Sequence, residues 1–237
     1  MATRRRFIVS ATDSRPHRVA TESEYEVVPN FERSVGQLRQ RLVENPPPGT
    51  ARIAKGDARA LDLPDATIDA VITSPPYLNA IDYLRGHRMS LVWLGHSIPE
   101  LRLVRSSSIG AERKADSHDQ KNEVDTVVTA MRGRSALPGR IEGIIQRYAL
   151  DLLSMAAEIA RVLKSGGSST YVVGNSCIKG TFINNAQGVA ESARIAGMEL
   201  VEMRERDLPV ANRYLPVTGD SLSKRMRTET ILVCKKP

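Results

Sequence analysis

Short apolar runs alternate with longer amphipathic stretches along most of the chain. Five short runs rich in apolar residues predict β-strands, at 51–54, 68–73, 169–174, 199–204 and 229–235. Between them, apolar residues recur three and four positions apart, most clearly over 140–163, which indicates a long helix. Shorter helices are expected at 83–94 and 184–196. Strands that alternate with helices are typical of βαβ units, so the pattern predicts an α/β fold.

A proline-rich break divides the chain near its N-terminus. Residues 31–44 are moderately amphipathic and predict a helix, after which Pro46-Pro47-Pro48-Gly49 breaks the chain. We therefore expect an N-terminal extension over residues 1–50 and a main domain over residues 51–237.

A polar, charged stretch over residues 95–139 then interrupts the rhythm of the main domain. We expect it to be an inserted loop. A connection of this length inside a compact domain is usually either functional or disordered, and the sequence leaves both open.

Composition narrows the class of protein. The chain has 237 residues, of which 41% are hydrophobic, enough to support a core. Its 34 Lys and Arg against 27 Asp and Glu give a net charge of +7, which fits a polyanionic partner without requiring one. Two cysteines without metal-ligand spacing predict a reduced, cytoplasmic protein with neither a disulfide framework nor a metal. No apolar run is long enough to predict membrane insertion.

The strongest chemical signal is the run Ser74-Pro75-Pro76-Tyr77, which directly follows the apolar strand 68–73. Two prolines force a rigid turn at the carboxyl end of that strand, where open α/β sheets bind ligands. There, the Ser74 hydroxyl and the Pro75 carbonyl could accept both hydrogens of one exocyclic amine, while the Tyr77 ring offers a stacking face. A tight loop with a half-buried tyrosine is the structural alternative.

This run, the preceding strand, Gly56-Asp57-Ala58 and Leu163-Lys164-Ser165-Gly166-Gly167 together resemble the amino-group DNA methyltransferases, which use S-adenosylmethionine. The resemblance extends from about residue 53 to the C-terminus. It implies a Rossmann-like α/β methyltransferase sheet with helices on both faces. It also implies a DNA partner, a restriction-modification setting, and Ser74, Pro75, Pro76 and Tyr77 as catalytic residues. Serine in the first position favours cytosine N4 over adenine N6.

The resemblance also assigns cofactor and DNA contacts. Asp57 would accept a hydrogen bond from the adenine amine of S-adenosylmethionine, and Thr73 would lie beside the cofactor. Six basic side chains are candidates for phosphate contacts, with ordinary surface charge as the alternative: Arg102, Arg105, Arg113, Lys114, Arg225 and Arg227.

One expected part is missing from the sequence. The Gly-rich loop that holds the methionine part of the cofactor is not found, and the five predicted strands correspond to the third to seventh of a seven-stranded sheet in the order 3-2-1-4-5-7-6. Strands one and two are not identified, although residues 6–10 and 25–28 are candidate strands. A partner chain that supplies the loop, a truncated copy, or a divergent loop would each explain this.

Two other functions stay open at this stage. The first is an RNA amino-methyltransferase, although an appended RNA-binding domain is not evident in 237 residues. The second is a nucleic-acid-binding remnant without catalytic activity, which fits the missing loop and the basic charge.

Overall fold

The computed structural model describes residues 8–10, 13–17, 26–78, 83–110, 120–133, 139–178, 181–208 and 228–237. The chain divides into two compact units, residues 1–55 and 56–237. The boundary therefore falls a few residues after the one expected from the Pro-Pro-Pro-Gly cluster.

The first unit contains a hairpin and a helix. Strands β1 (Ile8–Ser10) and β2 (Asp13–His17) pair antiparallel. Helix α1 (Val27–Glu44) confirms the predicted helix but begins earlier, so the strand expected at 25–28 is wrong for Val27 and Val28. Pro29 falls in the first helical turn, where its missing N–H costs no intrahelical bond.

The strand expected at 51–54 is also wrong. These residues are described, and they form neither helix nor strand. Ile53 is 95% exposed, so this apolar run has no buried face.

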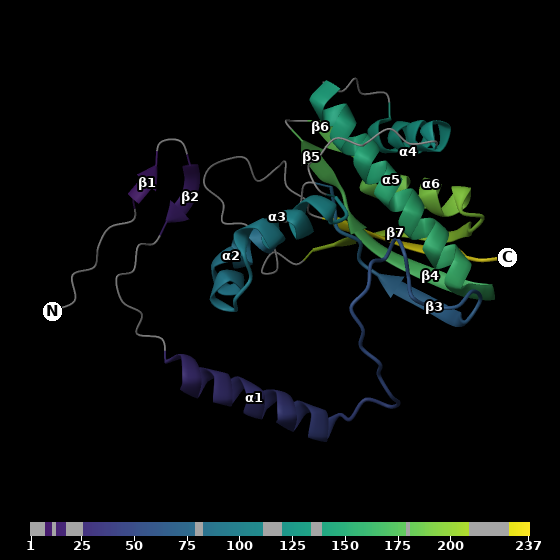
Figure 1. Cartoon of the computed structure of the whole chain (residues 1–237). Coiled ribbons are helices and arrows are strands. Elements are labelled where there is room, and N and C mark those ends of the chain that lie inside the picture. The colour runs from purple at the N-terminus through teal and green to yellow at the C-terminus, as the bar shows by residue number, and fades with distance from the viewer. Residues whose placement is uncertain are drawn as a thin grey trace. The chain divides into compact units, whose positions relative to one another are not determined.

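The second unit contains a four-stranded mixed sheet in the order β3-β4-β8-β7. Figure 1 shows β3 and β4 side by side in this sheet. Its strands are β3 (Ile68–Thr73), β4 (Leu163–Gly174), β7 (Glu199–Asp207) and β8 (Thr228–Lys235). Strands β3 and β4 run parallel, and β8 is antiparallel to both β4 and β7. The predicted α/β class and four of the five strands are confirmed, and their order matches 4-5-7-6 of the expected sheet.

Helices α4 (Lys121–Arg132), α5 (Gly139–Val162) and α6 (Asn185–Ile195) pack on one another, and α5 and α6 also pack on this sheet. The predicted helices at 140–163 and 184–196 are confirmed, as is α2 (Tyr83–Trp93). The strands and helices share one hydrophobic core, in which Tyr171 of β4, Leu232 of β8 and Leu152 of α5 are fully buried. Ile72, whose neighbour Val71 contacts the core, is instead 81% exposed.

The stretch expected to be an inserted loop is partly helical. It contains α3 (Ile98–Ser107) and α4, and residues Val124, Val127, Val128 and Met131 of α4 are buried in the core. Their spacing of three, one and three places them on one helix face. The polar residues between them concealed this short apolar stripe.

The end of α5 also differs from expectation. The helix was predicted to extend to residue 163, but α5 ends at Val162 and β4 begins at Leu163, so Gly166-Gly167 lies within the strand. The two glycines bond to the C-terminal segment: the Gly166 N–H donates to the Lys236 carbonyl, and the Lys236 N–H donates to the Gly167 carbonyl, each at 2.9 Å. A small hairpin, β5 (Ser176–Ile178) and β6 (Thr181–Ile183), follows β4.

No helix in the described part of the chain is both long and apolar enough to cross a membrane.

The two strands β3 and β4 approach so closely at Gly167 that a side chain there would meet backbone atoms. A Cβ atom at this position would lie 2.9 Å from the Lys164 carbonyl oxygen and 3.0 Å from the Asp69 carbonyl oxygen, both backbone atoms. We expect Gly167→Ala to lower the free energy of unfolding by about 1–3 kcal/mol in urea denaturation, because the backbone must move. Gly86→Ala on α2, where no atom lies within 4 Å, is the matched control and should not destabilise. Equal stability of both variants would contradict the close approach.

Candidate functional site

The Ser74-Pro75-Pro76-Tyr77 turn lies where it was predicted, directly after the last residue of the parallel strand β3. Pro75 is buried, Tyr77 is half-buried, and Ser74 and Pro76 are exposed. The following residue, Leu78, is fully buried in the core. The turn is thus anchored at both sides while Ser74 remains accessible.

Side-chain hydroxyl groups from three places hold this turn. The Ser74 hydroxyl donates to the Val172 carbonyl of β4 at 2.9 Å. Tyr148 of α5, which is fully buried, donates its hydroxyl to the Pro76 carbonyl at 2.9 Å. The Ser176 hydroxyl of β5 donates to the Leu78 carbonyl. The carbonyls of Pro76 and Leu78, which lie outside the strands, are thus satisfied by side-chain donors in place of a backbone ladder.

The bond to Val172 defines what Ser74 can do. A hydroxyl has one proton and two acceptor lone pairs, and the Ser74 proton is directed to a backbone carbonyl. Its oxygen therefore presents lone pairs and suits the amine-acceptor role predicted from the sequence. The role of the Pro75 carbonyl stays a prediction.

Tyr77 is oriented by the carboxylate of Glu229, which was not predicted from the sequence. Its hydroxyl donates to Oε1 of Glu229 at 3.0 Å, and it lies 3.4 Å from the Ser74 Oγ. Arg206 donates to Oε2 of the same carboxylate from Nη2 at 2.7 Å and from Nε at 3.1 Å. Burial, opposed by the Ser74 contact and reinforced by Glu229, raises the pKa of the Tyr77 hydroxyl.

Glu229 is 152 residues from Tyr77 in the sequence, so spacing gave no signal for this contact. Only the sheet order brings them together, because Glu229 of β8 lies opposite Gly174 at the end of β4.

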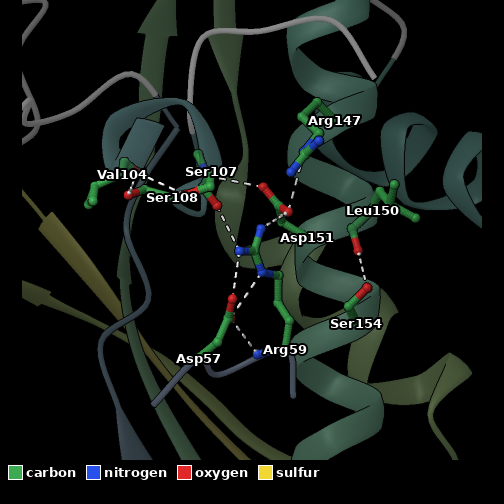
Figure 2. Close-up of polar contacts among 10 residues, drawn as sticks. Asp57, Arg59, Val104, Ser107, Ser108, Arg147, Leu150, Asp151 and Ser154 are labelled. Carbon is green, nitrogen blue, oxygen red and sulfur yellow. Dashed lines mark hydrogen bonds and ion pairs between the residues drawn. The ribbon is translucent and has the colours of Figure 1, made fainter. Parts of the chain in front are cut away.

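The second predicted element, Asp57, forms part of an ion-pair cluster with Arg59 and Asp151 (Figure 2). Oδ1 of Asp57 accepts from the Arg59 backbone N–H at 2.9 Å and from its Nε at 3.0 Å. Oδ2 accepts from Arg59 Nη2 at 2.8 Å. The same guanidinium donates from Nη1 to Oδ1 of Asp151 at 2.8 Å and from Nη2 to the Ser107 carbonyl at 2.7 Å.

This geometry limits the predicted cofactor role of Asp57 without removing it. Both lone pairs of Oδ1 are used, whereas Oδ2 has one hydrogen bond and can accept another. The Asp57 side chain is 49% exposed, so that oxygen is within reach of a ligand. Hydrogen bonds from Arg59 hold the pKa of this carboxyl below its ordinary value.

Helix α5 connects the two candidate sites. Asp151, whose side chain is 3% exposed, binds Arg59 and also accepts from the Gly110 N–H at 3.3 Å. Tyr148, three residues earlier on the same helix face, binds the Pro76 carbonyl. One rigid helix thus sets both the turn after β3 and the loop that contains Asp57.

The positions of the other predicted residues do not point to a specific role. Thr73 is half-buried and ends β3 opposite Tyr171. Arg102 and Arg105 lie on the exposed face of α3. Arg113, Lys114, Arg225 and Arg227 lie outside the described residues. Across the described ranges, no group of three or more His, Cys, Asp or Glu side chains is arranged to bind a metal.

Proteins similar to this chain include methyltransferases. No family model matches the chain. The chain is 44% identical over 45 residues to the type II methyltransferase M.BsoBI of Geobacillus stearothermophilus, a segment that is 19% of this chain and 9% of that relative. The predicted resemblance to DNA methyltransferases is confirmed over that short segment.

Solved structures give weak likenesses. A DNA modification methylase of Thermus thermophilus, complexed with S-adenosyl-L-methionine, has a TM-score of 0.41 at 17% identity. The match covers 77% of this chain and 51% of that one. The cytosine-N4-specific PvuII DNA methyltransferase has a TM-score of 0.40 at 16% identity, over 77% and 48%. The chain thus spans about half of each, and likeness at this level does not establish a shared function.

The Asp57–Arg59 pair predicts a specific pH dependence of stability. Because the pKa of Asp57 is lower in the folded state than its ordinary 3.8, the pair stabilises the fold above about pH 4 and this contribution is lost as the pH falls through the folded pKa. The effect is below about 1 kcal/mol, because the carboxylate is half exposed and screened.

Urea denaturation at a series of pH values measures this effect. Asp57→Asn should flatten the acid limb of the stability curve, and Arg59→Lys, which loses the planar fork, should flatten it as well. An acid limb that is unchanged in both variants would contradict the ion pair.

Proposed function

We propose that this chain acts in the transfer of a methyl group from S-adenosylmethionine to the exocyclic amine of a DNA base, with cytosine N4 as the target. The observation that most supports this is the state of Ser74: its proton is directed to the Val172 carbonyl at 2.9 Å, which leaves an exposed oxygen acceptor at the carboxyl end of a parallel strand. An acceptor there suits an N–H donor in the ligand.

The chemistry needs no covalent intermediate with the protein. A target base must leave the duplex stack to be reached, and the Tyr77 ring gives it a stacking surface. Ser74 and the Pro75 carbonyl would accept the two amine hydrogens, so that the nitrogen lone pair is aimed away from the turn. Placement and electrostatics then govern the reaction. S-adenosylmethionine supplies an electrophilic methyl group when bound.

The choice of base and nucleic acid rests on finer grounds. Serine in the first position of the motif supports cytosine N4 in preference to adenine N6. An RNA amino-methyltransferase and a non-catalytic nucleic-acid-binding protein are the two alternatives. Exposed Arg102 and Arg105 on α3 are proposed to contact phosphates, as are Arg113, Lys114, Arg225 and Arg227, because such contacts provide most of the affinity for DNA.

The described residues fit only one end of the proposed cofactor. Oδ2 of Asp57 can accept a hydrogen bond from the adenine amine. In the described sheet, however, no strand is followed by a loop with paired glycines that could hold the methionine end. Gly174 at the end of β4 is a single glycine followed by Asn175.

We therefore also propose a partner chain that supplies the Gly-rich loop. Within the described residues, β3 pairs only with β4, so its other edge has backbone N–H and C=O groups without a ladder. Proteins normally cover such an edge. A strand added parallel to β3 would place its own carboxyl end next to the Ser74 turn, where a cofactor loop is needed.

Methyl transfer from labelled S-adenosylmethionine tests the function. The tagged chain is purified from its own cells together with whatever it binds, and is offered DNA, RNA or neither. We expect label in DNA, and a loss of about 100- to 1,000-fold for Ser74→Ala, because one acceptor of the reacting amine is removed. Arg194→Ala on α6, which removes an exposed pair with Glu191, is the control and should retain activity. Label in RNA alone, or full activity of Ser74→Ala, would contradict the proposal.

Calorimetry tests the partner. The chain produced alone is expected to bind S-adenosylmethionine with a Kd of about 1 mM or weaker, because only the adenine end is held. The same chain purified from its own cells with its partner should bind at least tenfold more tightly. Micromolar binding by the chain alone would refute the need for a second chain.

A further inference from the structure

We infer that Glu229 is a positioning residue for the candidate site: it fixes the direction of the Tyr77 hydroxyl proton and thereby keeps the Ser74 oxygen available as an acceptor. This inference rests on the proposed function and adds to it a residue that the motif does not contain. The observation behind it is the hydrogen-bonded chain from Ser74 through Tyr77 and Glu229 to Arg206.

The carboxylate is held by the sheet and not by a loop. Glu229 of β8 and Arg206 of β7 are opposite each other in the antiparallel ladder. Their side chains pair through two donors of the guanidinium and the single oxygen Oε2. The Glu229 side chain is only 14% exposed, whereas that of Arg206 is 55% exposed. The other oxygen, Oε1, is thus left to accept from Tyr77 at 3.0 Å.

An ionised carboxylate is an acceptor only, and this decides the polarity of the chain. The Tyr77 proton must point to Glu229, so Tyr77 cannot donate it to the Ser74 oxygen 3.4 Å away. The Ser74 proton is directed to Val172 in the same way. Without the Glu229 charge, the tyrosine proton could turn toward Ser74 and compete with the substrate amine for the same lone pair.

The contact also fixes the tyrosine ring. A ring tethered at its hydroxyl cannot swing away from the turn, and stacking with a base needs a ring that is held in place. Preorganised partners of this kind support the side chains that contact substrate. The alternative is that Glu229 only stabilises the hairpin of β7 and β8 through Arg206.

Tyrosine titration distinguishes the two roles without any methyl transfer. Ultraviolet absorbance of the six tyrosines is followed with pH, and the difference from Tyr77→Phe isolates the Tyr77 transition. If Glu229 binds this hydroxyl, Glu229→Gln should lower the Tyr77 pKa toward 10.0, because a neighbouring negative charge is removed. Glu202→Gln on β7, which removes the carboxylate that pairs with Arg204, is the control and should leave the transition unchanged. An unchanged Tyr77 transition in Glu229→Gln would overturn the inference.

A double-mutant cycle tests the effect on the reaction. With the purified assembly, Glu229→Gln should lower kcat up to about 100-fold with little change in the KM for S-adenosylmethionine. In a Tyr77→Phe background, the same change should have almost no further effect, because the hydroxyl that it orients is absent. A full additional loss in that background would show that Glu229 acts through the hairpin alone and would overturn the role. If the unaltered protein transfers no methyl group, the proposed function fails, and the titration still decides whether Glu229 orients Tyr77.

Discussion

Two consecutive prolines, Pro75 and Pro76, follow the parallel strand β3 and cannot donate a backbone hydrogen bond to a neighbouring strand. The turn is held instead by side-chain hydroxyl groups: Ser74 donates to the Val172 carbonyl, and Tyr148 and Ser176 donate to the carbonyls of Pro76 and Leu78. Tyr148 and Ser176 come from different elements, α5 and β5. The position of the turn is therefore fixed only when β4, its following hairpin and α5 are all in place.

The same dependence explains why α5 is central to the molecule. Its buried Tyr148 binds the turn, and its buried Asp151 binds Arg59, which in turn orients Asp57. A buried carboxylate is tolerated only when it is paired, and Asp151 has Arg59 at 2.8 Å and Arg147 at 3.4 Å. Arg59 therefore holds the Asp57 carboxylate in one orientation, in which Oδ2 can still accept one more hydrogen bond.

Much of the fold could be read from the sequence, because it rests on local patterns. The strand 229–235 and the helix 140–163 have periodicities that their burial confirms, and 68–73 forms the strand that its apolar run predicts. Residues 51–54 show the limit, since an apolar run predicts a strand only if a partner strand is within reach. Helix α4 shows the opposite error, because its four buried residues are separated by polar ones that suggested a loop.

The site was predictable where it is contiguous and not where it depends on topology. Ser74 to Tyr77 are adjacent in sequence, and their residue types limit the chemistry that they can perform. Glu229, Arg206 and Tyr148 are brought to the turn only by the order β3-β4-β8-β7 and by the packing of α5.

The amine-acceptor role of Ser74 is the central claim. It is tested most directly by mass spectrometry of nucleosides from the DNA of cells that encode this chain at its natural locus, with and without Ser74→Ala. The account predicts N4-methylcytosine that disappears with the substitution; N4-methylcytosine that persists unchanged, or methylation that appears only at cytosine C5, would contradict it.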